Sequence, residues 1–181
     1  MKDLLVAVTM MVFMLIAIPS FAFTFRSISL DEPIENQIKA CEQEEKDVCY
    51  LKKENKQYEI FNLPRLSIIT KTMISVYGNE NRVGVIKETF NTKDADKMFS
   101  YLLDKYGSPR TIKGKIPKKI IVDRKTGIKT VIQCPVWSLD ECYIMMNDID
   151  ENDRDNGKVI IVSKKIFKIE IRKKGFKEAR R

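Results

Sequence analysis

Four cysteines are the residues of this chain best suited to chemistry, and they form two pairs with the same spacing. Cys41 and Cys49 bracket "EQEEKDV", while Cys134 and Cys142 bracket "PVWSLDE". Structural zinc sites usually place paired ligands two to four residues apart, and a thioredoxin-like redox site requires C-x-x-C. Neither spacing occurs here, so the pattern favours two disulfides over a metal or redox centre.

Four cysteines allow three pairings, and the sequence alone does not select one of them. The short polar segments inside each pair favour the local links Cys41–Cys49 and Cys134–Cys142. A closed loop of this size restricts the unfolded chain by about 2.5 kcal/mol in the chain-entropy description. The alternative is free thiols buried as small apolar side chains.

The N-terminal segment predicts export, a context in which disulfides persist. An apolar run from Leu4 to Ile18 follows Lys2 and is ended by Pro19. Ser20-Phe21-Ala22 then places small residues at the −3 and −1 positions of a cut after Ala22, as in a secretory signal peptide. We therefore expect a periplasmic or secreted protein. The alternative is an uncleaved helix anchored in the inner membrane, because the apolar character continues to Phe25.

Catalytic and cofactor-binding motifs are missing from the sequence. The chain contains no histidine, so Ser-His and Cys-His nucleophile systems are excluded. The acidic segment 148–157 fails the EF-hand pattern, since Asp153 and Val159 stand where a glycine and a glutamate are needed. We expect no metal, no cofactor and no catalytic residue. A hydrolase of cell wall or glycan that works with carboxylates alone remains the enzymatic alternative.

The net charge of +8 is concentrated near the C-terminus. Residues 164–181 hold nine Lys/Arg and two Glu, and the rest of the chain has a net charge of only +1. A basic tail is not the basic face of a nucleic-acid-binding domain, so no nucleic acid is expected as a partner. The tail either solubilises the chain or contacts anionic lipid, a cell-wall polymer or an acidic protein. Its candidate contact residues are Lys173, Lys174, Arg180 and Arg181.

Trp137, the only tryptophan, lies inside the second cysteine loop. It has two interpretations: a core residue that plugs the edge of a sheet, or an outward anchor that a partner touches. The core interpretation is favoured because tryptophan is highly buried on average.

Periodicity predicts an α+β fold with a twisted antiparallel sheet and two helices packed on one face. Helices are expected over 30–41 and 91–106, and a charged loop over 42–57. Expected strands cover 67–77, 82–90, 118–123, 128–134, 142–148, 158–163 and 165–171. The expected domain organisation is a signal peptide (1–22), a single domain (23–163) and a basic strand or tail (164–181).

The layout resembles small exported bacterial proteins of uncharacterised families, including two-layer folds of the β-lactamase-inhibitor and small outer-membrane assembly-factor kind. The residues that carry this resemblance are Phe25-Arg26, the segment Tyr106-Gly107-Ser108-Pro109, and Trp137. It implies non-catalytic protein binding and transfers no functional residue.

The sequence therefore predicts an exported protein that binds or inhibits another protein of the envelope. The alternative is a membrane-tethered component of secretion, conjugation or phage exclusion, held by its uncleaved N-terminal helix. Membrane contact through that helix or the basic tail is compatible with either function.

Overall fold

The computed structural model describes residues 23–42, 46–64, 66–122, 127–150 and 153–169. They form a sheet-rich α+β fold whose core is built on one large, mainly antiparallel sheet. The expected signal peptide, and the tail residues Lys173, Lys174, Arg180 and Arg181, lie outside the described residues.

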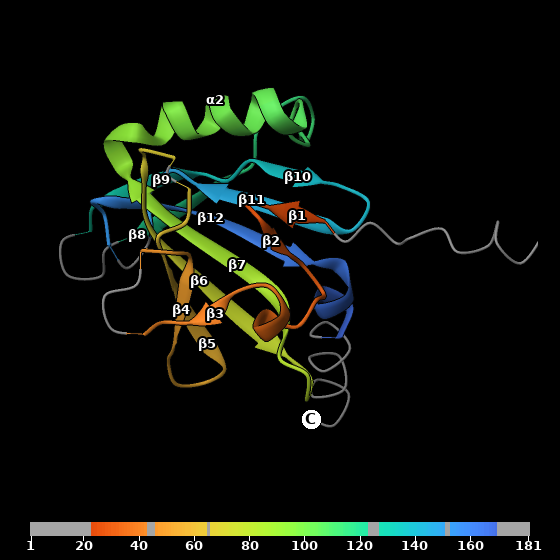
Figure 1. Cartoon of the computed structure of the whole chain (residues 1–181). Helices are drawn as coiled ribbons and strands as arrows, with labels where there is room; N and C mark the ends of the chain where they lie inside the picture. The colour runs from red at the N-terminus through yellow and green to blue at the C-terminus, as the bar shows by residue number, and fades with distance from the viewer. Residues whose placement is uncertain (1–22, 43–45, 65, 123–126, 151–152, 170–181) are drawn as a thin grey trace, which may run out of the picture.

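The large sheet has eight strands, and all neighbours pair antiparallel except β3 and β4 (Figure 1). In sheet order the strands are β10 (Val136–Ser138), β11 (Cys142–Asn147), β12 (Asn156–Ser163), β7 (Arg82–Asn91), β6 (Ile69–Tyr77), β5 (Gln57–Phe61), β4 (Cys49–Lys52) and β3 (Lys39–Ala40). Two small sheets accompany it: β1 (Thr24–Phe25) with β2 (Ile28–Ser29), and β8 (Lys118–Val122) with β9 (Lys129–Gln133).

The β6–β7 hairpin forms where the sequence predicts it. Its turn contains Gly78 and Asn81, which have positive φ angles of 71° and 48°. Glycine and asparagine tolerate this conformation better than other residues, which explains the "GNEN" turn signal. Along β7, burial alternates, so that Ile86 and Phe90 are fully buried on one face of the sheet.

The predicted helix over 91–106 is confirmed as η2 (Thr92–Asp94) followed by α2 (Ala95–Tyr106). The Asn91 side chain accepts a hydrogen bond from the amide of Lys93. Met98 and Leu102 are fully buried in the same core cluster as Ile86. Figure 1 shows α2 lying along one face of the large sheet.

The predicted helix over 30–41 is replaced by a short 3-10 turn, η1 (Ile34–Asn36). The side-chain amide of Gln37, the residue after η1, explains the difference. It accepts a hydrogen bond from the Ser29 amide and donates one to the Ser29 carbonyl. These bonds fold the segment back on β2, and the chain then continues as β3. Ile34 and Ile38 are both buried, so the apolar spacing that suggested a helix is satisfied by the 3-10 turn and the bend that precedes β3.

The charged segment 42–57, expected to be a loop, contains β4 and the turn of a second hairpin, and β5 begins at its last residue, Gln57. The turn of this β4–β5 hairpin places Asn55 and Lys56 at φ angles of 57° and 58°, as a two-residue hairpin turn of the primed type requires. Tyr58 and Ile60 are buried, whereas Glu59 between them points to the opposite face of the strand. The exposed charges therefore conceal a half-buried strand pattern.

Residues 164–169 are helical, where the sequence predicts the start of a final strand. Ser163 ends β12, and its hydroxyl accepts a hydrogen bond from the Lys165 amide at 3.1 Å, as an N-cap residue does. The same hydroxyl donates a hydrogen bond to the Asp31 carboxylate at 2.7 Å. The Tyr77 hydroxyl donates a second one to this carboxylate at 2.6 Å. This shared carboxylate ties the end of β12 to β6 and to the N-terminal segment.

A buried ion pair fixes the β1–β2 hairpin to the sheet. The Arg26 guanidinium donates to the Glu88 carboxylate, and also to the Pro64 carbonyl at 2.6 Å. Thr72, directly opposite Glu88 on β6, donates to the same carboxylate. Burial raises the pKa of Glu88 more than the Arg26 charge lowers it. The pair therefore joins three segments at a site that neither charge could occupy alone.

We expect Glu88→Ala to lower the free energy of unfolding by about 3–5 kcal/mol, because it leaves the buried Arg26 charge without a partner. The double variant Arg26→Met/Glu88→Leu should be more stable than Glu88→Ala, since it removes both charges. Urea denaturation measures both effects. A double variant no more stable than Glu88→Ala would show that the unpaired charge is not the cause.

Candidate binding surface

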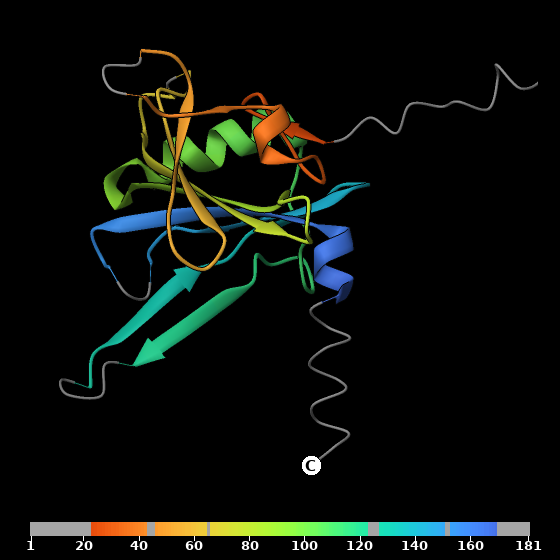
Figure 2. The same cartoon turned by 60° about the horizontal axis from the view of Figure 1, so that its bottom comes forward.

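The β8–β9 hairpin is the element that stands out from the body of the fold. Figure 2 shows it projecting from the large sheet on the side opposite α2. Its two strands pair antiparallel from Lys118–Gln133 to Val122–Lys129, as the sequence predicts. Because directly opposed residues of an antiparallel pair lie on one face, this register assigns each side chain to the inner or outer face of the hairpin.

The inner face is attached to the body. Ile132 is buried, and Ile121 and Thr130 line a narrow gap with Ile149 and Asp150. Asp150 is itself buried and accepts a hydrogen bond from Lys158 of β12 at 3.1 Å. These contacts hold the base of the hairpin against the sheet.

Asp150 also shows which face of the sheet the hairpin covers. Its carboxylate lies 3.7 Å from the ammonium of Lys87 on β7. Successive strand residues point to opposite faces, so Lys87 points away from the buried Ile86 and from α2. The hairpin therefore lies over the outer face of the large sheet.

The outer face of the hairpin is apolar and exposed. Ile120 is 62% exposed, and its cross-strand partner Val131 is 48% exposed. Val122 shares this face and is 49% exposed. Lys118 and Lys129 lie at its two ends. We call Lys118, Ile120, Val122, Lys129 and Val131 the outer hairpin face.

The hairpin region is also strongly basic. Residues 110–129 contain eight Lys/Arg and one Asp, a net charge of +7. Without this region and residues 164–181, the chain holds 16 Lys/Arg and 22 Asp/Glu, a net charge of −6. The net charge of residues 1–163 is only +1, because the acidic residues elsewhere offset this second basic region. Charges summed over each predicted hairpin would have found it.

A second basic and apolar element lies on the same side of the sheet. In the helical turn 164–169, which we call the C-terminal turn, the Phe167 ring packs edge-on against Tyr143 at 5.0 Å. The ammonium of Lys164 lies over the Tyr143 ring, 5.1 Å from its centroid. Tyr143 alternates with the buried Cys142 and Ile144, so it belongs to the outer face of the sheet. Phe167 and Ile169 remain more than a third exposed.

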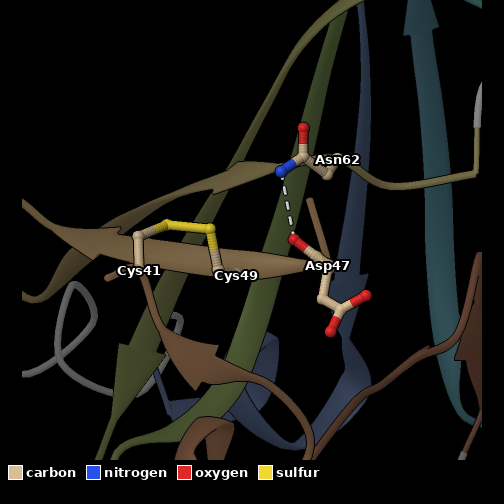
Figure 3. The surroundings of a disulfide bond; sticks show 4 residues. All are labelled: Cys41, Asp47, Cys49 and Asn62. Atoms are coloured by element: carbon tan, nitrogen blue, oxygen red, sulfur yellow. Dashed lines mark hydrogen bonds between the residues drawn. A yellow bond between two sulfur atoms is a disulfide. The ribbon is translucent and has the colours of Figure 1, made fainter. Parts of the chain in front are cut away.

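The predicted Cys41–Cys49 disulfide is confirmed (Figure 3). The sulfurs are 2.09 Å apart and the Cα atoms 4.9 Å apart. The link joins the chain just after β3 to the first residue of β4, while Asn62 donates to the Asp47 carbonyl at 3.0 Å within the loop. The disulfide therefore closes the outermost strand pair of the sheet, far from β10 in the strand order.

The predicted Cys134–Cys142 disulfide is wrong, because both residues are free thiols. The register of β10 and β11 aligns Trp137 with Ile144, which places Cys134 near the level of Asn147. Five residues of extended strand separate this level from Cys142, or about 17 Å. A disulfide needs Cα atoms within about 7 Å of one another. The two cysteine pairs therefore share the same sequence spacing, but only Cys41 and Cys49 form a disulfide.

Trp137 is a core residue and is only 2% exposed. Its indole N–H donates to the Gly107 carbonyl at 2.7 Å, and its ring lies 6.0 Å from that of Phe99. It thus joins β10 to the C-terminal end of α2. The interpretation of Trp137 as an outward anchor for a partner is wrong.

Acidic and cysteine side chains are the remaining candidate metal ligands of the described residues. Within these ranges no three acidic or cysteine side chains come together as a metal site. A hollow of about 340 Å³ beside β5 and β6 is lined by Arg26 and Lys71, but these cations bind Glu88 and Glu59 respectively. None of the helices among the described residues has the length and apolarity needed to cross a bilayer.

Comparison of the chain with protein-family models, curated protein sequences and solved structures gave no significant match. The resemblance to exported two-layer proteins therefore stays a prediction.

The thiols provide a direct test of the sheet register. In the folded protein without reductant, iodoacetamide should modify the half-buried Cys134 and leave the fully buried Cys142 intact. Burial raises the pKa of the Cys142 thiol to about 12 and also raises that of Cys134, so modification of Cys134 should accelerate with pH. Peptide mapping by mass spectrometry gives both results.

The same peptide map should contain the linked Cys41 and Cys49 peptides. Modification of all four cysteines after unfolding and reduction is the control. A linked Cys134–Cys142 peptide would contradict the β10–β11 register.

Proposed function

We propose that this chain is an exported, non-catalytic binding domain of the cell envelope and that the outer hairpin face is its contact surface. The observation that supports this best is the concentration of exposed aliphatic side chains on and beside the β8–β9 hairpin. The partner expected from the sequence is another envelope protein, which the domain would bind or inhibit.

The exposed apolar side chains are unevenly distributed. Ten large apolar residues are well exposed among the described residues, and half of them lie between positions 112 and 131. These five are Ile112, Ile120, Val122, Ile128 and Val131. Single exposed apolar side chains are ordinary, but a cluster of them typically marks an interaction surface.

The hairpin is also built to hold this surface in place. Its inner face is anchored through Ile132 and the loop that carries Asp150. Asp150 in turn is fixed by Lys158 and Lys87. A surface presented by an anchored strand pair loses less conformational freedom on binding than a surface on a free loop.

Export is supported by two features of the N-terminal half. The expected cut after Ala22 precedes β1 at Thr24, so cleavage would leave every described element intact. The Cys41–Cys49 disulfide is of a kind that persists in oxidising compartments.

Photo-crosslinking in the native envelope tests the proposed contact surface. A crosslinking amino acid at Val131 or Ile120 should give products with an envelope component, because both side chains lie on the outer hairpin face. Position Leu51 on β4 is the matched control, since it is 46% exposed near the opposite edge of the large sheet.

Crosslinking should be several times more efficient at Val131 and Ile120 than at Leu51. Equal efficiency at all three positions, or products at Leu51 alone, would move the contact away from the hairpin and remove the basis of the proposal.

A further inference from the structure

We infer that the outer hairpin face binds the anionic surface of a lipid bilayer and that the C-terminal turn makes a second contact with it. This inference rests on the proposed function, because it names the partner of the same surface. It departs from the envelope protein expected from the sequence.

The charge of the hairpin region suits a broad anionic surface. Six of its basic residues are described, and all six are exposed: Arg110, Lys113, Lys115, Lys118, Lys119 and Lys129. They are distributed along both strands and the segment before β8. Each basic residue close to an anionic leaflet adds to the attraction without requiring a partner at a fixed position.

The types of apolar side chain in the hairpin region also favour a lipid surface. Between Arg110 and Gln133 there is no aromatic residue and no methionine. Protein interfaces typically depend on tryptophan, tyrosine and arginine anchors that fill pockets. Isoleucine and valine surrounded by lysine instead offer apolar area and charge without a specific shape, which is what the interface of a bilayer accepts.

The position of the C-terminal turn makes a joint contact feasible. The turn packs on Tyr143 on the outer face of the sheet, the side from which the hairpin projects (Figure 2). Phe167 and Ile169 are exposed there beside Lys165 and Lys168. Two contacts on one rigid body strengthen binding beyond what either gives alone.

The charge of the rest of the chain would orient the domain. Outside residues 110–129 and 164–181 the net charge is −6, so an anionic leaflet repels the body while it attracts the two basic regions. The α2 face would therefore point away from the membrane.

Co-sedimentation with lipid vesicles tests this inference. The probes are vesicles of phosphatidylglycerol mixed with phosphatidylcholine, and vesicles of phosphatidylcholine alone. The chain from Phe23 to Arg181, which contains every described residue, should bind the anionic vesicles and not the neutral ones. Binding should weaken as the salt concentration rises, because salt screens exposed charges.

Two variants of the outer hairpin face locate the contact. Lys118→Gln/Lys129→Gln should bind about 25-fold more weakly, because each basic residue near an anionic surface contributes about a fivefold gain in affinity. Ile120→Thr/Val131→Thr should bind at least about threefold more weakly, since it removes apolar surface while threonine retains a preference for strands.

The matched control is Lys39→Gln/Lys52→Gln, which removes two exposed lysines at the far edge of the large sheet. This variant should bind within about twofold of the unchanged chain, because its charges lie at the edge of the large sheet farthest from β10 in the strand order. Circular dichroism and thermal unfolding should be unchanged in all three variants, since every substituted side chain is exposed.

Three outcomes would overturn the lipid assignment. They are failure of the unchanged chain to bind anionic vesicles, equal binding to neutral vesicles, and hairpin variants that bind as well as the control. If vesicle binding fails while Val131 still crosslinks to an envelope protein, the partner is a protein and the proposed function survives. If both experiments fail, the proposed function fails as well.

Discussion

The fold depends on β7 being paired along both of its edges, with β6 on one side and β12 on the other. A strand in this position assigns its side chains strictly to two faces. One face carries Ile86 and Phe90 into the core that α2 covers. The other face carries Lys87, which meets the loop below the β8–β9 hairpin. The separation of a buried core from a projecting contact surface follows from this strand.

Buried polar groups then attach the outlying segments to this sheet. Glu88 holds the β1–β2 hairpin through Arg26, and Asp150 holds the loop under the β8–β9 hairpin through Lys158. Asp31 connects the N-terminal segment to the end of β12 through Ser163. Glu88 and Asp31 bind partners more than 60 residues away in sequence, and Asp150 also binds Lys87 on β7, so these groups hold distant segments together. The Asp150 bonds, which lie beside the β8–β9 hairpin, also hold the outer hairpin face in place.

Much of the fold could be predicted, because strong local signals decide it. The capped apolar stripe of α2 and the turn between β6 and β7 act within a few residues. The segment 30–41 could not, since Gln37 bonds to Ser29 and replaces the expected helix with a turn. Strand β5 was missed because it follows a highly charged segment and alternates over only five residues, Gln57–Phe61. In each case a tertiary contact overrides the local pattern.

The contact surface was only partly predictable. The β8–β9 hairpin follows from two runs rich in β-branched residues and the glycine-containing turn between them, but its exposed face depends on which face of the hairpin carries the buried Ile132. The Cys134–Cys142 disulfide predicted from cysteine spacing is wrong for a related reason: the register of β10 and β11 separates the two residues. Spacing in the sequence therefore does not predict which cysteines pair or which side chains are exposed, because both depend on the register of the strands.

Hydrogen–deuterium exchange in the presence of anionic vesicles is the most direct measurement of the central claim, which is that the hairpin and the C-terminal turn are the contact surface. The account predicts slower amide exchange over 112–133 and 164–169, with exchange in α2 and in β3–β4 unchanged. Slower exchange confined to α2 or to the β3–β4 edge would contradict it.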